Sequence, residues 1–198
     1  MRGAETPSRR GRPAAATPSD VLDAAMYRYL RGRRVDVQAI AAELGLGRTT
    51  IYRWFGSREQ LIGEVVARAA EPLIDAARAG ARGRGGALLL DTFDRLNRSL
   101  ADAPALRSFV EQERDAALRI ITSSGGVVQP RTVARIQALI EEEAQAGTYE
   151  PPVDPGTLAY AIVRLAEAFL FNDAAAGMRG DVDRLKEVEA ALLGVFPG

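Results

Sequence analysis

The chain contains no cysteine and no histidine, and only one of its 26 basic residues is lysine. Without cysteine there is no disulfide and no thiolate metal site. Without histidine the commonest base of acid–base and nucleophilic catalysis is missing. An enzyme built on this chain would need a carboxylate pair or Lys186, for which the sequence suggests no partner. We therefore expect a protein that is not an enzyme and that needs no metal and no cofactor.

Long apolar runs are also missing. No stretch approaches the ~20 apolar residues that span a bilayer, and the N-terminus has no apolar signal core. The chain has 198 residues and is 47% hydrophobic, which is enough to bury a core in one or two domains. We expect a cytoplasmic protein without membrane contact.

The net charge of zero hides a difference between the two ends. Residues 1–60 hold 11 arginines against 6 acidic residues, a balance of +5. Residues 61–198 hold 15 basic against 20 acidic residues, a balance of −5. A basic end indicates a polyanionic partner. The preference for arginine over lysine has a simpler explanation, a GC-rich genome, and says little about phosphate recognition by itself.

Apolar residues recur with the period of an α-helix along most of the chain, and no segment reads convincingly as a strand. The predicted fold class is therefore all-α. Residues 1–18 are rich in arginine, proline and small residues, which predicts a disordered basic arm. Pro72 is expected to kink or split the helix that contains it. The expected helices cover residues 19–30, 37–44, 47–55, 58–79, 87–101, 104–122, 130–146, 155–176 and 181–195.

Two of the short predicted helices, 37–44 and 47–55, are joined by a tight turn at Gly45. This pattern is typical of a helix-turn-helix unit, whose second helix enters the DNA major groove. Threonine can meet base edges, and arginine and tyrosine can hold phosphates or read guanine. The pattern alone leaves open a structural helix pair with a solvated basic face. If Leu46, Ile51 and Phe55 pack inward, the side chains left outside are those of Arg48, Thr49, Thr50, Tyr52 and Arg53.

The segment VDVQAIAAELGLGRTTIYRWFGSREQLIGEVV resembles the DNA-binding domain of the TetR family of transcriptional regulators. The likeness rests on the glycine turn, the small N-cap, the aromatic pair and the Ser-Arg-Glu-x-Leu that opens the next helix. It implies a helix-turn-helix domain over residues 19–64 and a helical ligand-binding and dimerisation domain over residues 65–198. It further implies roles for single residues: Thr49, Thr50 and Arg53 reach bases, Tyr52 and Trp54 contact the DNA backbone, and Arg58 attracts a phosphate at a helix N-terminus.

The basic arm contains RGRP, residues 10–13, which resembles the core of an AT-hook. In such a segment Arg10 and Arg12 would lie in a narrow, A·T-rich minor groove. General attraction to phosphates, or no role, are the alternatives.

The predicted helix 155–176 is apolar on more than one face, so it must be buried on more than one side. A core on one side and a second subunit on the other would bury it. Together with the last helix, which carries Leu185, Val188 and Leu192, it can form an intersubunit four-helix bundle, as the family resemblance also implies. A homodimer supplies the two recognition helices that a palindromic operator in double-stranded DNA needs.

Polar groups on apolar stripes are the candidates for a small-molecule effector site, because ligand pockets are apolar with a few placed polar groups. The alternatives for each are a buried ion pair or a contact across the dimer. The candidate residues are Phe93, Asn97, Phe109, Glu113, Ala117, Arg164, Glu167 and Asn172.

Residues 118–173 resemble the C-terminal domain of QsdR-type TetR regulators, a subgroup linked to the degradation of quorum-sensing signals and lactones. This resemblance implies a lactone-like effector. The whole sequence then predicts a ligand-responsive repressor that binds a palindromic operator as a dimer and leaves it when a small molecule binds. An activator or a corepressor-dependent regulator of the same fold, and a helical ligand-binding module without specific DNA binding, remain open.

Overall fold

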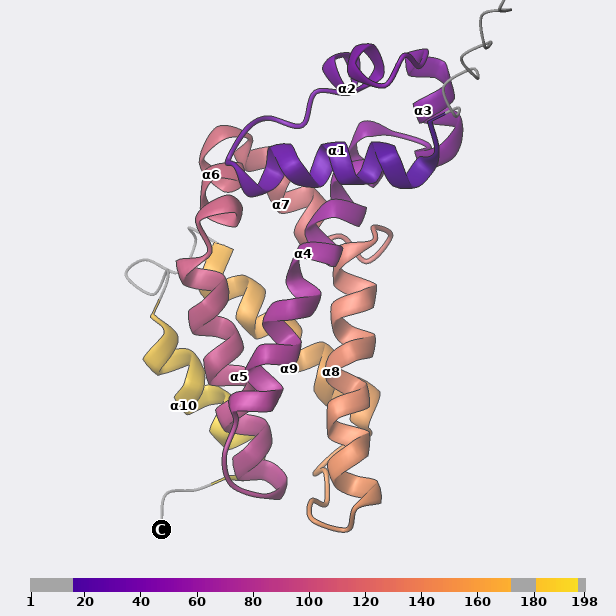
Figure 1. The fold of residues 1–198 in the computed structure, drawn as a ribbon. Helices are drawn as coiled ribbons and strands as arrows, with labels where there is room; N and C mark the ends of the chain where they lie inside the picture. Colours follow the sequence, from indigo (N-terminus) through magenta and orange to yellow (C-terminus); the bar gives the residue numbers. More distant parts are fainter. Residues whose placement is uncertain (1–15, 172–180, 196–198) are drawn as a thin grey trace, which may run out of the picture.

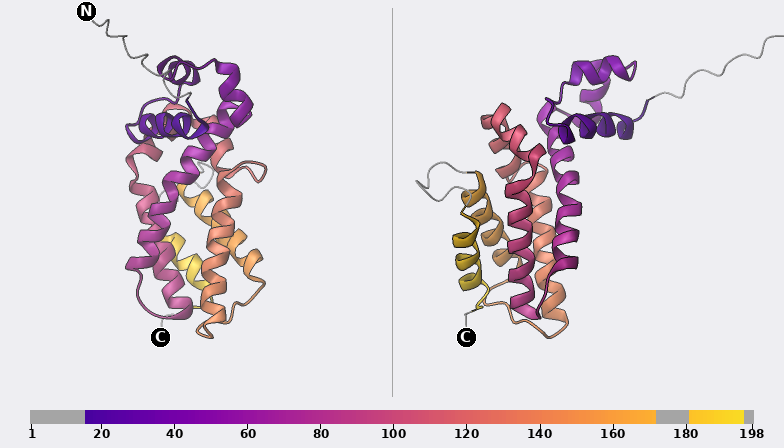
Figure 2. Two further views of the ribbon diagram at one scale, coloured as in Figure 1. Left: turned by 45° about the vertical axis from the view of Figure 1, so that its right-hand side comes forward. Right: turned by 60° about the vertical axis from the view of Figure 1, so that its left-hand side comes forward.

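The protein, seen in a computed structural model, is described over residues 16–171 and 181–195, and every regular element in these ranges is an α-helix (Figure 1). This confirms the predicted all-α class. Helices α1–α3 form a small head, and α5–α10 form an elongated body beneath it (Figures 1 and 2). The helices are α1 Pro18–Leu30, α2 Val37–Glu43, α3 Arg48–Phe55, α4 Arg58–Gly80, α5 Gly85–Asp102, α6 Pro104–Gln112, α7 Arg114–Thr122, α8 Val128–Gln145, α9 Pro155–Phe171 and α10 Val182–Leu192.

Helix α4 runs from the head deep into the body (Figure 1). It is one helix of 23 residues. Pro72 therefore does not split it, which was one of the two outcomes that the sequence predicted. Proline has no N–H to offer the carbonyl of residue 68, but both positions are exposed. Water can therefore satisfy the freed carbonyl, and the helix continues. The start of α4 is capped, because the Ser57 hydroxyl accepts a hydrogen bond from the backbone N–H of Gln60 at 3.1 Å.

The head does not have a core of its own. Ile40, Ile51 and Leu61 are fully buried in an apolar cluster that also includes residues of α6 and α7. Within this cluster the Tyr29 ring meets the Phe109 ring edge-on, with the ring centroids 6.2 Å apart. A second cluster fills the lower body between α4, α5, α8 and α9. A shift of α6 and α7 must therefore be felt by the head, because close-packed interiors transmit displacement.

The segment 104–122 forms two helices rather than the single helix we expected. Glu113 separates them, with φ −139° and ψ 50°, well outside the helical region. The apolar stripe continues across the break, so the period of the sequence does not reveal it. At this break the Glu113 side chain meets Arg58, at the start of α4.

The other boundaries differ from expectation by a few residues. Helix α1 begins at Pro18, and Thr17 caps it in a capping box with Asp20. The described part of α9 ends at Phe171, so the expected continuation to residue 176 lies outside the described residues. None of the described helices is long and apolar enough to cross a membrane.

The turn between α2 and α3 depends on Gly45, whose φ is +65°. The N–H of Leu46 donates to the Ala41 carbonyl at 2.8 Å, and the N–H of Gly45 donates to the Ala42 carbonyl at 3.4 Å. These two bonds close a Schellman motif, which requires a left-handed residue after the helix. The predicted glycine turn is confirmed, and it sets the angle at which α3 leaves α2.

We expect Gly45→Ala to destabilise the protein by about 1 kcal/mol or more, because an L side chain is strained at this φ. Gly47→Ala is the matched control. An added Cβ would meet nothing within 4 Å at either position, and only Gly45 has a positive φ. The control should change stability by less than about 0.5 kcal/mol. Urea unfolding measures both variants, and equal losses would contradict this reading of the turn.

Candidate DNA-binding helix and effector cavity

Helix α3 presents one buried face and one open face. Ile51 is fully buried, and Leu46 and Phe55 pack against the head cluster while partly exposed. The inward face is thus the one that the sequence predicted. The outward face is made by Arg48, Thr49 and Arg53, which are exposed, by Thr50, which is half-buried, and by Tyr52, which is 39% exposed.

The two arginines of α3 differ in their ion pairing from other basic side chains of the head. Within the part of the chain that the structure describes, neither Arg48 nor Arg53 is held in an ion pair. Arg28, on α1, pairs with Glu43 at 2.6 Å. Two uncompensated positive charges on an exposed helix provide the electrostatic attraction that a polyanion requires.

Trp54 and Arg58 lie differently from the expected backbone and phosphate contacts. Trp54 is half-buried and packs against the head cluster. The guanidinium of Arg58 points back into the protein: its Nε donates to the Val35 carbonyl at 3.0 Å, and its Nη atoms donate to both oxygens of Glu113 at 2.6 and 2.7 Å. All of its donor nitrogens therefore have protein partners, which leaves none directed at a phosphate.

The pair between Arg58 and Glu113 fastens the first turn of α4 to the junction of α6 and α7. It is bidentate, the strongest geometry for a guanidinium and a carboxylate. Hydrogen bonding to Arg58 lowers the pKa of Glu113, against the opposing effect of burial, and Arg34 at 3.4 Å lowers it further. The contact of Arg58 with Val35 adds the loop between α1 and α2 to the same joint. We call this joint, made by Val35, Arg58 and Glu113, the head–body clamp.

The body contains a cavity between α4 and the surrounding helices. Its walls come from α4 to α10 and are almost wholly apolar. The enclosed volume is about 80 Å³. Pockets for drug-sized ligands measure roughly 300–1,000 Å³, so a ligand of that size would have to push the walls apart. The apolar lining includes Val66, Ala70, Ile74, Phe93, Leu96, Ile136, Ile162, Leu170 and Phe171.

Four polar residues line the cavity: Asn97, Thr132, Glu167 and Glu189. The Gln129 amide donates to both oxygens of Glu167 at 3.0 and 3.1 Å, and Arg164 donates to one of them at 2.8 Å. Burial nevertheless raises the pKa of Glu167. Buried carboxylates beside an apolar space are unusual and need a physical role.

Three of the predicted cavity residues, Phe93, Asn97 and Glu167, line this cavity. Four others do not line it. Phe109 and Ala117 are buried in the cluster shared with the head. Glu113 is in the clamp, and Arg164 is exposed and donates to Glu167 and to the Thr122 carbonyl. Asn172 and the arm residues Arg10 and Arg12 lie outside the described residues.

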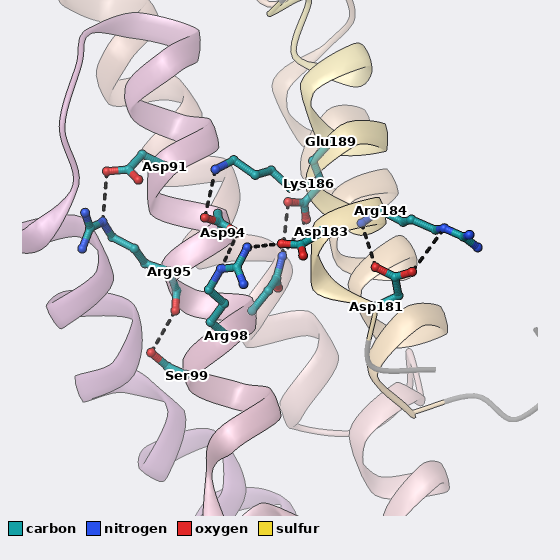
Figure 3. A network of polar contacts seen from close by, with 11 residues as sticks. Asp91, Asp94, Arg95, Arg98, Ser99, Asp181, Asp183, Arg184, Lys186 and Glu189 are labelled. Carbon is teal, nitrogen blue, oxygen red and sulfur yellow. Dashed lines mark hydrogen bonds and ion pairs between the residues drawn. The ribbon is translucent and has the colours of Figure 1, made fainter. Parts of the chain in front are cut away.

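The sequence reasoning missed Glu189, which is fully buried. A signal was available: Val182, Leu185 and Glu189 recur at helical spacing, which places an acid on the inner stripe of the last helix. Beside it, charged side chains of α5 and α10 form a network (Figure 3), in which Lys186 reaches Asp94 at 3.1 Å and Arg98 bridges Asp94 and Asp183.

A helix-turn-helix head with an open basic helix, set on a helical body that holds an apolar cavity, defines a class: regulators of transcription that bind DNA and sense small molecules. Residues 21–65 match the model of bacterial regulatory proteins of the tetR family, and residues 84–194 match that of the tetracyclin repressor-like C-terminal domain. The chain belongs to the TetR family of transcriptional regulators, whose members are generally not enzymes.

Solved structures agree with this assignment. The structure of the R. erythropolis transcriptional repressor QsdR is similar over 91% of this chain and 96% of its own, with 27% identity and a TM-score of 0.85. That of AlkX from Dietzia sp. strain DQ12-45-1b, a repressor implicated in biodegradation of n-alkanes, is similar in fold over 90% and 96%, with 24% identity and a TM-score of 0.60. No curated protein matches the chain.

We expect Glu113→Gln to lower the free energy of unfolding by about 1–3 kcal/mol at pH 7, because it replaces a largely buried charge pair and leaves Arg58 without its anion. Glu59→Gln is the matched control, since Glu59 also joins α4 to α7, through Arg119 at 3.0 Å, but both side chains are exposed. The control should cost less than about 1 kcal/mol.

The pH dependence gives a second reading of the same variant. The pKa of Glu113 is lowered in the folded protein, so its contribution is complete above the ordinary carboxyl value of ~4.3 and is lost as the pH falls through the folded value. The stability gap between the parent and Glu113→Gln should therefore close at acid pH. A gap that is unchanged down to the pH of acid unfolding would show that the clamp carries no ionic contribution.

Proposed function

We propose that the protein is a dimeric repressor that binds a palindromic operator and is released from it by a small molecule. The observation that carries the proposal is the position of α4. Its first residue, Arg58, belongs to the head–body clamp, and three of its later residues, Val66, Ala70 and Ile74, line the cavity. One continuous helix thus touches both the effector space and the DNA-binding head.

The outward face of α3 is the proposed reading surface. Thr49, Thr50 and Arg53 are assigned to base edges, and Arg48 and Tyr52 to phosphates at the sides of the groove. Their exposure and the absence of an ion pair at Arg48 and Arg53 in the described ranges support this assignment. Arg10 and Arg12 of the arm are proposed to add minor-groove contacts.

Dimerisation through α9 and α10 is favoured by the apolar side chains they leave uncovered. Tyr160 on α9 is 50% exposed and Val188 on α10 is 39% exposed. The two helices pack against each other at one edge of the body (Figure 2, right). A second copy placed there would bury these side chains and make the intersubunit four-helix bundle.

The proposed release from the operator rests on the small volume of the cavity. An effector larger than the enclosed space must move a wall, and α4 is one of the walls. Moving α4 displaces the clamp and with it the head, which changes the separation of the two recognition helices in the dimer. A ~100-fold loss of operator affinity requires that the effector prefer the displaced state by ~2.7 kcal/mol. The resemblance of residues 118–173 makes a lactone-like molecule the first effector class to examine.

The direct test is selection of bound DNA from a random pool by the full-length protein at moderate salt. We expect enrichment of an inverted repeat with half-site centres about 34 Å, or a multiple of this, apart. Binding that shows no enrichment and simply collapses as salt rises would mean contact with phosphates only, and would overturn the proposal. An effector that tightens binding to the enriched site would indicate a corepressor-dependent regulator.

On the selected operator, Arg53→Ala should cost about 1–3 kcal/mol of binding and relax the preference at one base pair of each half-site. Arg135→Ala is the matched control, because it removes the same charge from the body, where Arg135 pairs with Asp75 at 2.8 Å. Fluorescence anisotropy on specific and random duplexes measures both. Equal losses on the two duplexes would contradict a reading role for Arg53.

A further inference from the structure

Besides Asn97 and Thr132, the polar residues of the cavity wall are two carboxylates, Glu167 and Glu189, and these two differ in their charged neighbours. Glu167 has a cation beside it, since Arg164 donates to it at 2.8 Å. Glu189 has none: within residues 16–171 and 181–195 its partner is the side-chain amide of Asn97, at 3.0 and 3.2 Å from its two oxygens. Glu189 is fully buried, so water does not replace the missing cation.

The basic side chains near Glu189 are paired with other carboxylates. The nearest lysine, Lys186 on the same helix, reaches Asp94 instead, at 3.1 Å (Figure 3). Arg98 on α5 is engaged with Asp94 and Asp183, and α9 contributes a second acid, Glu167, to the same cavity. Burial raises the pKa of Glu189 to about 7, and the charge of Asp94 adds to this, while the hydrogen bond from Asn97 opposes it.

This arrangement selects the charge of a ligand. An anionic head group would face two acids in a space of low dielectric, and no basic side chain of the described residues lines that space to receive it. A cation would meet an oxygen pair that has no counter-ion. Folding has already removed Glu189 from water, so an entering cation loses only its own hydration in forming the pair.

We propose that the cavity binds a cationic amphiphile, whose protonated amine pairs with Glu189 and whose apolar part packs among the side chains of α4, α8 and α9. This rests on the proposed function, in which the same cavity is the effector site, and it names the chemical class of the effector. It also excludes a free fatty acid or another carboxylate of similar length as the effector, because Glu167 and Glu189 would repel its negative charge.

The competing ligand class is a neutral one. A protonated Glu189 could donate its O–H to a carbonyl, as a lactone would require. The two classes respond to pH in opposite ways: a cation binds the ionised carboxylate and a carbonyl binds the protonated acid. Above the pKa of Glu189 the cation should be favoured, and this is where the two are best compared.

The test is calorimetric titration of the full-length protein, without DNA, at pH 8 with four probes that share an aliphatic tail: octylammonium, octanol, octanoate and an alkyl-substituted lactone. We expect octylammonium to bind at least about tenfold more tightly than each of the other three. A lactone or octanoate that binds as tightly as octylammonium, or no binding by any probe, would overturn the inference.

Two variants test whether Glu189 is the group that gives the preference for octylammonium. Glu189→Gln keeps the shape and the hydrogen bond from Asn97 but removes the charge, so the advantage of octylammonium should fall by about tenfold or more. Glu167→Gln is the matched control on the other acid, which already has Arg164, and it should retain the preference. Thermal unfolding shows that both variants are folded. A preference that survives Glu189→Gln would place the cation elsewhere.

The experiments distinguish a failure of the cationic ligand from a failure of the regulatory proposal. If octylammonium binds through Glu189 but leaves the operator complex intact, the ligand class stands and the release mechanism fails. If the lactone binds preferentially and releases the operator, the regulatory proposal stands and the cationic ligand is refuted.

Discussion

The bidentate contact between Arg58 and Glu113 is the joint on which the arrangement of this protein depends. It ties the first turn of α4 to the break between α6 and α7, and through Val35 it includes the loop between α1 and α2. A helix cannot be displaced at one end without carrying the other, because its hydrogen-bonded backbone is stiff. The cavity along α4 and helix α3, which precedes the start of α4, are therefore connected through this one helix.

The two proposed binding surfaces have opposite chemistry, and each follows from its surroundings. The head exposes Arg48 and Arg53, which no acid of the described residues neutralises, and this suits a polyanion in water. The body encloses acids in an apolar space, which suits a small molecule removed from water. In the head, exposure keeps charged groups available at little cost. In the body, burial raises the pKa of Glu167 and Glu189, against the opposing effect of their hydrogen bonds from Gln129 and Asn97.

Phe109, Glu113 and Ala117 share a stripe at helical spacing, which made all three candidates for one cavity. In the structure Phe109 and Ala117 are buried in the cluster shared with the head, and Glu113 between them pairs with Arg58. Likewise, an arginine at the start of a helix is a reasonable phosphate ligand by pattern, and only the structure shows that the Arg58 guanidinium is bound by Val35 and Glu113.

The sequence by itself determined the helical class, the glycine turn and the inward and outward faces of α3, because each of these depends on residues within a few positions of one another: the period of apolar side chains, a cap, a left-handed glycine. It also determined the family, through the motif around that turn. Only the tertiary structure decided that Glu167 and Glu189 line the cavity and that Arg58 is bound by Glu113. These depend on pairs such as Arg58 with Glu113 and Asn97 with Glu189, which lie 55 and 92 residues apart in the chain. The local period of apolar residues does not indicate which distant residues meet, because such contacts form when whole helices pack together.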